Sequence, residues 1–228
     1  MHVLITRPLP AGAATADAVA ALDFVPLLAP TLVVCARELG EIPAGLVAVA
    51  VTSGNALPGL PVSLHRLPLF AVGDATAERA RAVGFAYVTS AGADAAALAA
   101  LLARRAPEGP LLLAVGEGQG ATLEQALRAA GRAVHRRVLY AAEPAAELPA
   151  AAVAALRAGT VGAALFFSAE TARVFVRLVE AAGLADALGG VRACAIGGAA
   201  VVALRTLRWR EIRQARRPTQ EAMLALLQ

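Results

Sequence analysis

The chain has no lysine, few aromatic residues, two cysteines and three histidines. Cys35 and Cys194 lie far apart and do not have the spacing of metal ligands, so we expect buried thiols and exclude a disulfide scaffold. His2, His65 and His135 form no ligand cluster, which excludes a metal hydrolase.

Long apolar runs are also missing, although 58% of the 228 residues are hydrophobic. The longest runs, such as 46–51 and 95–103, are much shorter than a membrane span. The opening, MHVLITRP, has no long apolar region and no cleavage-like site, so we expect no signal peptide. These absences predict a cytoplasmic protein with no membrane partner.

Arginine supplies the positive charge, and the net charge is +4. A net positive surface suits an anionic partner. The densest run, RTLRWREIRQARR at 205–217, contains Trp209 and has the composition of a nucleic-acid-binding patch. An exposed helix end followed by an edge strand is the alternative. Nothing else resembles a nucleic-acid module, so we expect no nucleic-acid partner.

Apolar segments of strand length alternate with helical segments along the whole chain. Strands are expected near 2–6, 24–34, 46–52, 68–72, 110–115, 133–141, 162–167, 191–196 and 209–214. Helices are expected at 11–22, 75–83, 94–105, 120–130, 147–157, 169–182, 199–206 and 219–227. Such alternation is typical of parallel sheets covered by helices.

The order of these segments occurs twice. A strand, a turn, a helix and a second strand ending in Pro30 open the chain, and a matching series ends in Pro144. Each series is followed by a strand that ends in a hydroxyl residue, Ser53 or Ser168, and then by a strand that ends in a glycine turn. This order predicts two α/β domains related by duplication.

Several segments, taken in order, resemble the uroporphyrinogen-III synthase family. They are VLITRP, VTSGNA, FAVGDATAERARAVGF, VLYAAEP, LFFSAETARVF, and AIGGAAVVAL followed by RPTQEAMLALL. The resemblance covers nearly the full chain and depends on the order and spacing of these segments. It implies an α/β fold with two flavodoxin-like parallel-sheet domains joined by a two-stranded linker.

In that arrangement the first domain is discontinuous. The expected domains are 1–30 with 145–228, and 38–135, and the expected linker segments are 31–37 and 136–144. The linker ladder is expected to pair FVPLLAPTLVV with RRVLYAA. Two crossings between domains would form a hinge, with a cleft at the carboxyl ends of the strands.

The resemblance also implies the reaction, which is the cyclisation of hydroxymethylbilane with inversion of its last pyrrole ring. The enzyme would be a cofactor-free, monomeric hydro-lyase of haem biosynthesis. Loss of the terminal hydroxyl gives an azafulvene, which attacks the substituted carbon of the last ring to form a spiro intermediate. The protein then has to hold this geometry and exclude water.

Only the departing hydroxide needs a proton donor, and Tyr140 matches the family tyrosine proposed for that role. The alternative for Tyr140 is a packing residue. The substrate, a linear tetrapyrrole, carries acetate and propionate carboxylates on every ring, and helix N-termini bind such anions. The expected substrate-binding residues are Thr6, Arg7, Thr52, Ser53, Gly73, Thr76, Gly116, Ser168, Gly197, Gly198 and Thr219. The hydroxyl residues among them also suit helix N-caps.

Two turns depart from the family pattern. IGGAA at 196–200 lacks hydroxyl donors, and AVGEGQGAT carries Glu117, which would repel a carboxylate. VGEGQG also resembles a dinucleotide-binding loop but lacks the full fingerprint. A second alternative is a non-catalytic two-lobed protein that binds an anionic small molecule, because it would share the hinge and the two crossings.

Overall fold

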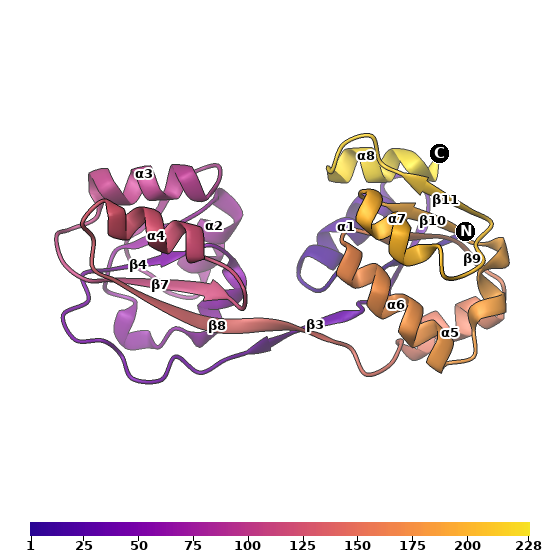
Figure 1. Cartoon of the computed structure of the whole chain (residues 1–228), viewed down its shortest axis with the longest axis horizontal. Helices are drawn as coiled ribbons and strands as arrows, with labels where there is room; N and C mark the ends of the chain where they lie inside the picture. Colours follow the sequence, from indigo (N-terminus) through magenta and orange to yellow (C-terminus); the bar gives the residue numbers. More distant parts are fainter. The chain divides into compact units, whose positions relative to one another are not determined.

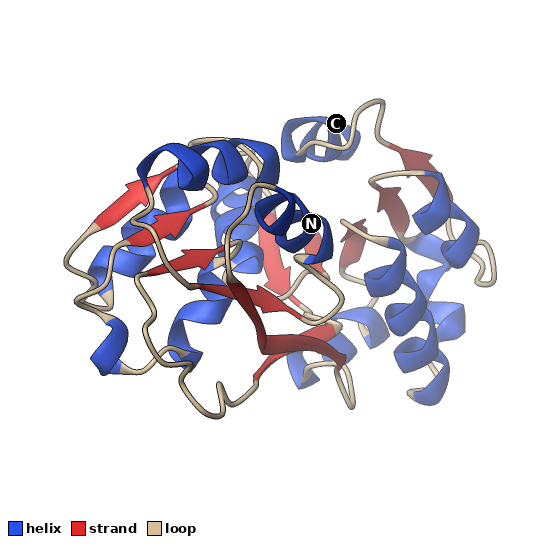
Figure 2. Ribbon diagram, turned by 60° about the vertical axis from the view of Figure 1, so that its left-hand side comes forward, coloured by secondary structure: helices blue, strands red, loops and turns tan.

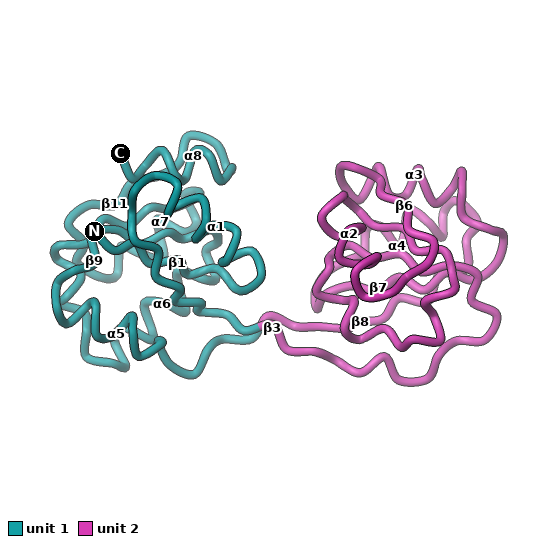
Figure 3. Tube along the Cα trace, turned by 180° about the vertical axis from the view of Figure 1, so that it is seen from behind, with its two compact units in different colours: residues 1–33, 143–228 teal, residues 34–142 magenta.

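The computed structural model describes residues 1–228 as two compact units (Figure 3). Unit 1 comprises residues 1–33 and 143–228, and unit 2 comprises residues 34–142. Each unit contains one sheet with helices packed on both faces (Figures 1 and 2). Unit 1 is therefore built from both ends of the chain.

The sheet of unit 1 has five strands, which pair in parallel in the order β11-β10-β9-β1-β2. Their bounds are β1 His2–Ile5, β2 Val25–Leu28, β9 Val161–Phe166, β10 Arg192–Ala195 and β11 Glu211–Gln214. Strands β1, β2, β9, β10 and β11 follow one another along unit 1, so this order is the 2-1-3-4-5 order of flavodoxin-like folds.

Alternate residues of β1 face opposite layers of unit 1. Val3 and Ile5 pack with α1 and α8, whereas Leu4 packs with α5, α6 and α7. The helices are α1 Ala11–Ala20, α5 Ala150–Arg157, α6 Ala169–Ala181, α7 Gly198–Leu204 and α8 Gln220–Leu224. β1 is buried on both faces and supplies apolar residues to both helical layers. The helices pack their apolar sides against these residues.

The sheet of unit 2 has six strands in the order β3-β8-β7-β4-β5-β6. Their bounds are β3 Leu32–Ala36, β4 Ala48–Val51, β5 Leu69–Ala71, β6 Val88–Ser90, β7 Leu111–Gly116 and β8 Val134–Pro144. Strands β4 to β8 pair in parallel. β3 and β8 are neighbours in this sheet and carry the chain between the units.

The two sheets have the same spatial order once β3 is set aside. In unit 2, β8-β7-β4-β5-β6 corresponds to β2-β1-β9-β10-β11 of unit 1. Each sheet thus takes two strands from one repeat of the sequence and three from the other. This exchange agrees with a duplicated chain.

Unit 2 is also a three-layer structure. Val49 and Val51 pack with the 3-10 helix η1 (Gly54–Gly59) and α2 (Asp74–Ala82), whereas Ala48 and Ala50 pack with α3 (Ala95–Arg105) and α4 (Ala121–Ala129). The remaining 3-10 helices are η2 Val62–Leu64, η3 Ala185–Gly190 and η4 Ala225–Leu227. No helix of the protein is both long and apolar enough to cross a membrane.

The parallel α/β prediction is confirmed, with two differences in the strands. β6 was not expected, because it is a short edge strand whose residues are only half-buried. The expected strand 24–34 is two strands, β2 and β3, because the chain leaves the sheet of unit 1 after β2 and joins the sheet of unit 2 at β3. β2 pairs with β1 in unit 1, so the expected ladder was wrong over residues 25–28, and of β2 and β3 only β3 lies beside β8.

The basic run 205–217 forms a helix end and the edge strand β11, and its tryptophan is not exposed as in a nucleic-acid-binding patch. Trp209 is buried, and its Nε1 donates to the Leu204 carbonyl over 2.9 Å. Glu211 pairs with Arg192 and Arg213, and these guanidinium groups lower its pKa to about 2. The alternative interpretation of this run as a helix end and an edge strand is confirmed.

The two cysteines differ in burial. Cys194 is fully buried within β10, and desolvation raises its pKa to about 12. Cys35 lies on β3 and is only half-buried. The expectation of buried thiols is therefore confirmed for Cys194 and holds only in part for Cys35.

Candidate active site

The expected site residues follow strands that run in parallel, so within each unit they gather at the carboxyl edge of one sheet. In unit 2, Thr52 and Ser53 follow β4, Gly73 follows β5, and Gly116 ends β7. Such an edge is the usual ligand-binding face of an open parallel sheet.

Tyr140 lies at the edge of unit 2, directly over Gly116. The two residues are paired in the β7–β8 ladder. A Cβ atom at position 116 would lie 2.6 Å from Tyr140 Cζ and 2.8 Å from Tyr140 Oη, so only glycine leaves room for the phenol. Tyr140 is 6% exposed, and its hydroxyl donates to Gln119 Oε1 over 3.2 Å.

The glycine-rich loop after β7 is shaped around this tyrosine. Gly118 and Gly120 have φ angles of 71° and 82°, which side-chain-bearing residues rarely adopt. Arg136 donates to the Gln119 carbonyl over 3.2 Å and pairs with Glu124, which holds the loop against α4. The glycines of VGEGQG are thus explained without a dinucleotide.

Thr52 marks a small pocket on the α3–α4 side of the same edge. Its Oγ1 is buried and has no hydrogen-bond partner. It lines a pocket of about 330 Å³ together with Gln119, Gly120 and Thr122. The adjacent α4 begins without a side-chain cap, so its first N–H groups lack a side-chain acceptor. An unsatisfied buried hydroxyl in such a pocket favours a polar ligand.

Ser53 has a donor to spare, although it is also a helix cap. Its Oγ accepts a hydrogen bond from the Asn55 amide over 3.2 Å, and no acceptor takes its hydroxyl proton. Gly73 caps α2 and Thr76 lies half-buried in the first turn of that helix. A Cβ at Gly73 would contact nothing within 4 Å, so the structure does not require glycine there for space.

In unit 1, Thr6 is not available to a ligand. Its side chain is fully buried, and its hydroxyl donates to the Leu165 carbonyl over 2.7 Å. The Thr6 carbonyl accepts in turn from the Thr31 amide. Thr6 therefore ties β1 to its neighbours, and its hydroxyl proton is already donated within unit 1.

Arg7, the next residue, is a half-buried cation without an acidic partner. Its Nη1 donates to Thr15 Oγ1 and Gln220 Oε1, each over 3.2 Å, and its guanidinium carbon lies 4.4 Å from the centre of the Phe167 ring. Partial burial lowers the pKa of Arg7. A fixed, partly desolvated and unneutralised guanidinium is well suited to bind a carboxylate.

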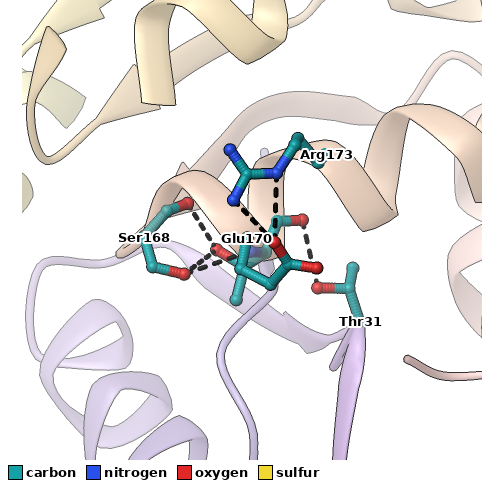
Figure 4. Close-up of polar contacts among 5 residues, drawn as sticks. Thr31, Ser168, Glu170 and Arg173 are labelled. Atoms are coloured by element: carbon teal, nitrogen blue, oxygen red, sulfur yellow. Dashed lines mark hydrogen bonds and ion pairs between the residues drawn. The ribbon is translucent and has the colours of Figure 1, made fainter. Parts of the chain in front are cut away.

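Ser168 is a closed helix cap in unit 1 (Figure 4). Its Oγ accepts from the Thr171 amide over 3.0 Å, and its hydroxyl donates to Thr171 Oγ1 over 3.1 Å. Thr171 Oγ1 donates back to the Ser168 carbonyl over 2.9 Å, and Thr31 donates to the Thr171 carbonyl. The hydroxyl groups satisfy one another, which leaves Ser168 no free donor.

The remaining predicted residues of unit 1 lie at the starts of two helices. Gly197 caps α7 and Gly198 begins it, and neither supplies a side-chain donor. Thr219 caps α8 by accepting from the Ala222 amide over 3.2 Å. The backbone N–H of Glu221 and then the Thr219 hydroxyl lower the pKa of the exposed Glu221 carboxyl group through hydrogen bonds. These residues shape the edge and contribute only backbone groups or a cap.

Two glutamines were missed in the sequence. Gln119 accepts the hydrogen bond of Tyr140, and Gln220 accepts those of Arg7 and Thr15. Gln220 directly follows the predicted Thr219, and Gln119 lies in the loop that follows Gly116. Their position next to predicted site residues was the available signal.

The fold defines an α/β protein in which each of two parallel sheets presents polar groups at its carboxyl edge. The chain belongs to the uroporphyrinogen-III synthase HemD family, which it matches over residues 13–225. No curated protein sequence matches the chain closely enough to count as a relative.

The chain is also similar to solved structures. A uroporphyrinogen-III synthetase from Helicobacter pylori 26695 is 19% identical, with a TM-score of 0.61 over 99% of this chain and 97% of that one. A uroporphyrinogen III synthase from the extremely thermophilic bacterium Thermus thermophilus is 21% identical over 100% of this chain and 96% of that one, with a TM-score of 0.43. The first of these similarities shows the shared fold.

Proposed function

We propose that the protein is a uroporphyrinogen-III synthase that cyclises hydroxymethylbilane with inversion of the last pyrrole ring. The observation that carries this proposal is family membership over residues 13–225. The reaction is that of a cyclising hydro-lyase, and we expect it to need no metal ion or other cofactor. We expect the enzyme to act as a monomer in the cytoplasm.

Substrate carboxylates bind at the carboxyl edges of the sheets. In unit 2 the donors are the spare hydroxyl proton of Ser53 and the buried hydroxyl of Thr52, which has no hydrogen-bond partner. In unit 1 the donor is the guanidinium of Arg7, which has no acidic partner. Charge-assisted hydrogen bonds of this kind are stronger than neutral ones and fix the geometry of a flexible chain of rings.

Tyr140 supplies the proton for the departing hydroxyl. The phenol protonates the hydroxyl so that it leaves as water, while the pyrrole nitrogen donates the electron pair that forms the azafulvene. A positioned acid of this kind contributes roughly 10²–10⁴-fold to the rate. The azafulvene carbon then bonds to the substituted carbon of the last ring, and the spiro intermediate fragments and recloses.

Gln119 controls the state of that phenol. The hydroxyl donates to the amide oxygen of Gln119 in this structure. The oxygen and nitrogen of an amide exchange places by a half-turn of the side chain, after which Nε2 donates to the phenol oxygen. In that orientation the phenol proton is free for the substrate, and the developing negative charge on the phenol oxygen is stabilised. Because Gln119 is exposed, its side chain has room for this turn.

The test is the isomer ratio of the product. Purified protein is supplied with hydroxymethylbilane made in situ, and the oxidised porphyrins are separated by chromatography. We expect an excess of the type III isomer over the protein-free control, because unaided closure gives mainly the uninverted isomer. A ratio equal to the control would overturn the proposal and favour a non-catalytic binding protein.

Cofactor independence is tested on the same sample. Activity should survive exhaustive chelation and dialysis. Recovery of activity only after a metal ion or nucleotide is added would contradict this part of the proposal.

A further inference from the structure

Arg79 lies flat on the backbone of Gly54 at the carboxyl edge of unit 2. A Cβ atom at Gly54 would lie 2.6, 2.8 and 2.9 Å from Nη1, Cζ and Nε of Arg79. The guanidinium therefore occupies the space that any other side chain at position 54 would take. Although Arg79 is exposed, it covers Gly54, which is buried.

No acidic group neutralises this cation. Arg79 forms no ion pair, and its side chain has no hydrogen-bond partner. Asp74 and Glu78 lie on the same helix, and both are exposed. Asp74 places a negative charge in the first turn of α2, which makes that helix end a poor anion site. The positive charge at this part of the edge therefore comes from Arg79.

The position of the guanidinium follows from its helix. Side chains of an α-helix point back toward its N-terminus, so a residue in the middle of α2 reaches toward the carboxyl edge of the sheet. η1, which begins at Gly54, packs against both α2 and β7. The side chain of Arg79 therefore extends from α2 to the carboxyl edge of the sheet.

The same edge carries Tyr140. Val51 of β4 pairs with Ala114 of β7, so Ser53 is level with Gly116, on which the phenol of Tyr140 lies. Gly54 follows Ser53 directly. The Arg79 guanidinium, the spare hydroxyl proton of Ser53 and the phenol therefore lie along one edge of one sheet.

We infer that Arg79, positioned by Gly54, binds a carboxylate of the tetrapyrrole substrate. This inference rests on the proposed function and adds a specific residue to it. The guanidinium fork and the hydroxyl of Ser53 together suit a propionate or acetate group, because a carboxylate accepts hydrogen bonds at both oxygens. Arg79 does not take part in the proton transfer, so it acts on affinity.

The experiment measures the affinity for uroporphyrin III, which carries acetate and propionate groups on every ring, by equilibrium titration, and KM and kcat for hydroxymethylbilane. The variants are Arg79→Ala, Gly54→Ala and the double variant. Gly54 does not have a positive φ, so alanine keeps the backbone conformation and displaces only the guanidinium. Arg104→Ala is the matched control, because Arg104 is an exposed, unpaired arginine in the last turn of α3.

We expect Arg79→Ala to raise the dissociation constant and KM roughly tenfold, the effect of one hydrogen bond to a charged group, with kcat little changed. Gly54→Ala should reproduce this loss. The double variant should have the same dissociation constant and KM as Arg79→Ala, because both changes remove the same contact. Arg104→Ala should behave as the unmodified protein.

Unchanged porphyrin affinity in Arg79→Ala would overturn the inference, as would an equal loss in Arg104→Ala or no porphyrin binding by the unmodified protein. Additive losses in the double variant would overturn the role of Gly54. These results are distinct from failure of the proposed function, which is read from the isomer ratio of the unmodified protein. Arg79→Ala could weaken porphyrin binding while the unmodified protein gives the same isomer ratio as the protein-free control. That result would support the carboxylate site at Arg79 and overturn the proposed synthase activity.

Discussion

The phenol of Tyr140 fills the space over Gly116 in which any side chain at position 116 would lie. A Cβ there would come within 2.6 Å of Tyr140 Cζ. The β7–β8 register shifts between Val115 and Gly116, and this irregularity brings Tyr140 opposite Gly116. The position of the proposed acid therefore depends on a residue without a side chain on the neighbouring strand.

Replacing Tyr140 by phenylalanine should lower kcat by about 10–100-fold, because the departing hydroxyl loses its proton donor while the pyrrole nitrogen still assists. KM and the type III preference should stay largely intact, since the ring still fills the space over Gly116. The measurement is steady-state kinetics with analysis of product isomers. An unchanged kcat would make Tyr140 a packing residue, and a lost isomer preference at an unchanged rate would mean that it orients the last ring.

Gly116→Ala should move the phenol without removing it. Crowding of a buried site costs about 1–3 kcal/mol of stability. We expect the free energy of unfolding to fall by that amount and kcat to fall toward the Tyr140→Phe value. Chemical denaturation and kinetics of both variants and of the double variant provide the check. If kcat in Gly116→Ala equals that of the unmodified protein, the exact place of the phenol does not matter to the reaction.

Most of the fold was predictable because strands buried on both faces are continuous apolar runs. Val161–Phe166 and Leu111–Gly116 stand out in this way. β6 did not, because a short edge strand buries little and has a weak signal. The break between β2 and β3 was not predicted either, because both strands are apolar and they differ only in their neighbours, which are β1 for β2 and β8 for β3.

The site was less predictable, because a hydroxyl at a strand end has two possible uses. Thr6 and Ser53 look alike in sequence, yet Thr6 donates to a buried carbonyl and Ser53 keeps its proton free. Only the surrounding atoms separate these cases. Arg79 gave no signal, because its role depends on Gly54, which lies on another element.

Glu211 predicts a pH-dependent stability in unit 1. Arg192, Arg213 and Arg210 hold its pKa near 2, well below the ordinary value of 4.5. A lowered pKa in the folded state means stabilisation at pH values above the unfolded pKa, which is lost as the pH falls through the folded value. Glu211→Gln should therefore lower Tm at neutral pH by a few degrees.

That difference in Tm should shrink as the pH falls from about 4.5 toward 2. Thermal melts across this range test it. Glu170→Gln is the control, because Glu170 pairs only with Arg173 on an exposed helix surface, where an ion pair contributes little. A Tm difference for Glu211→Gln that is the same at every pH would contradict the role of the charge.

Ser53 and Ser168 should separate binding from folding. The hydroxyl of Ser168 donates a hydrogen bond to Thr171 Oγ1, whereas the hydroxyl of Ser53 has no acceptor. Ser168→Ala should therefore lower the free energy of unfolding by about 0.5–2 kcal/mol, the cost of a lost N-cap, with little change in KM.

Ser53→Ala should weaken substrate binding by about 0.5–3 kcal/mol and disturb folding less. Ser53→Asp keeps the cap acceptor but replaces the donor with a negative charge, so its KM should rise further while its Tm is kept. Chemical denaturation and kinetics on all three variants measure both effects. Equal losses of stability and affinity in Ser53→Ala and Ser168→Ala would show that both serines serve only as helix caps, and the carboxylate would then depend on backbone amides and arginine.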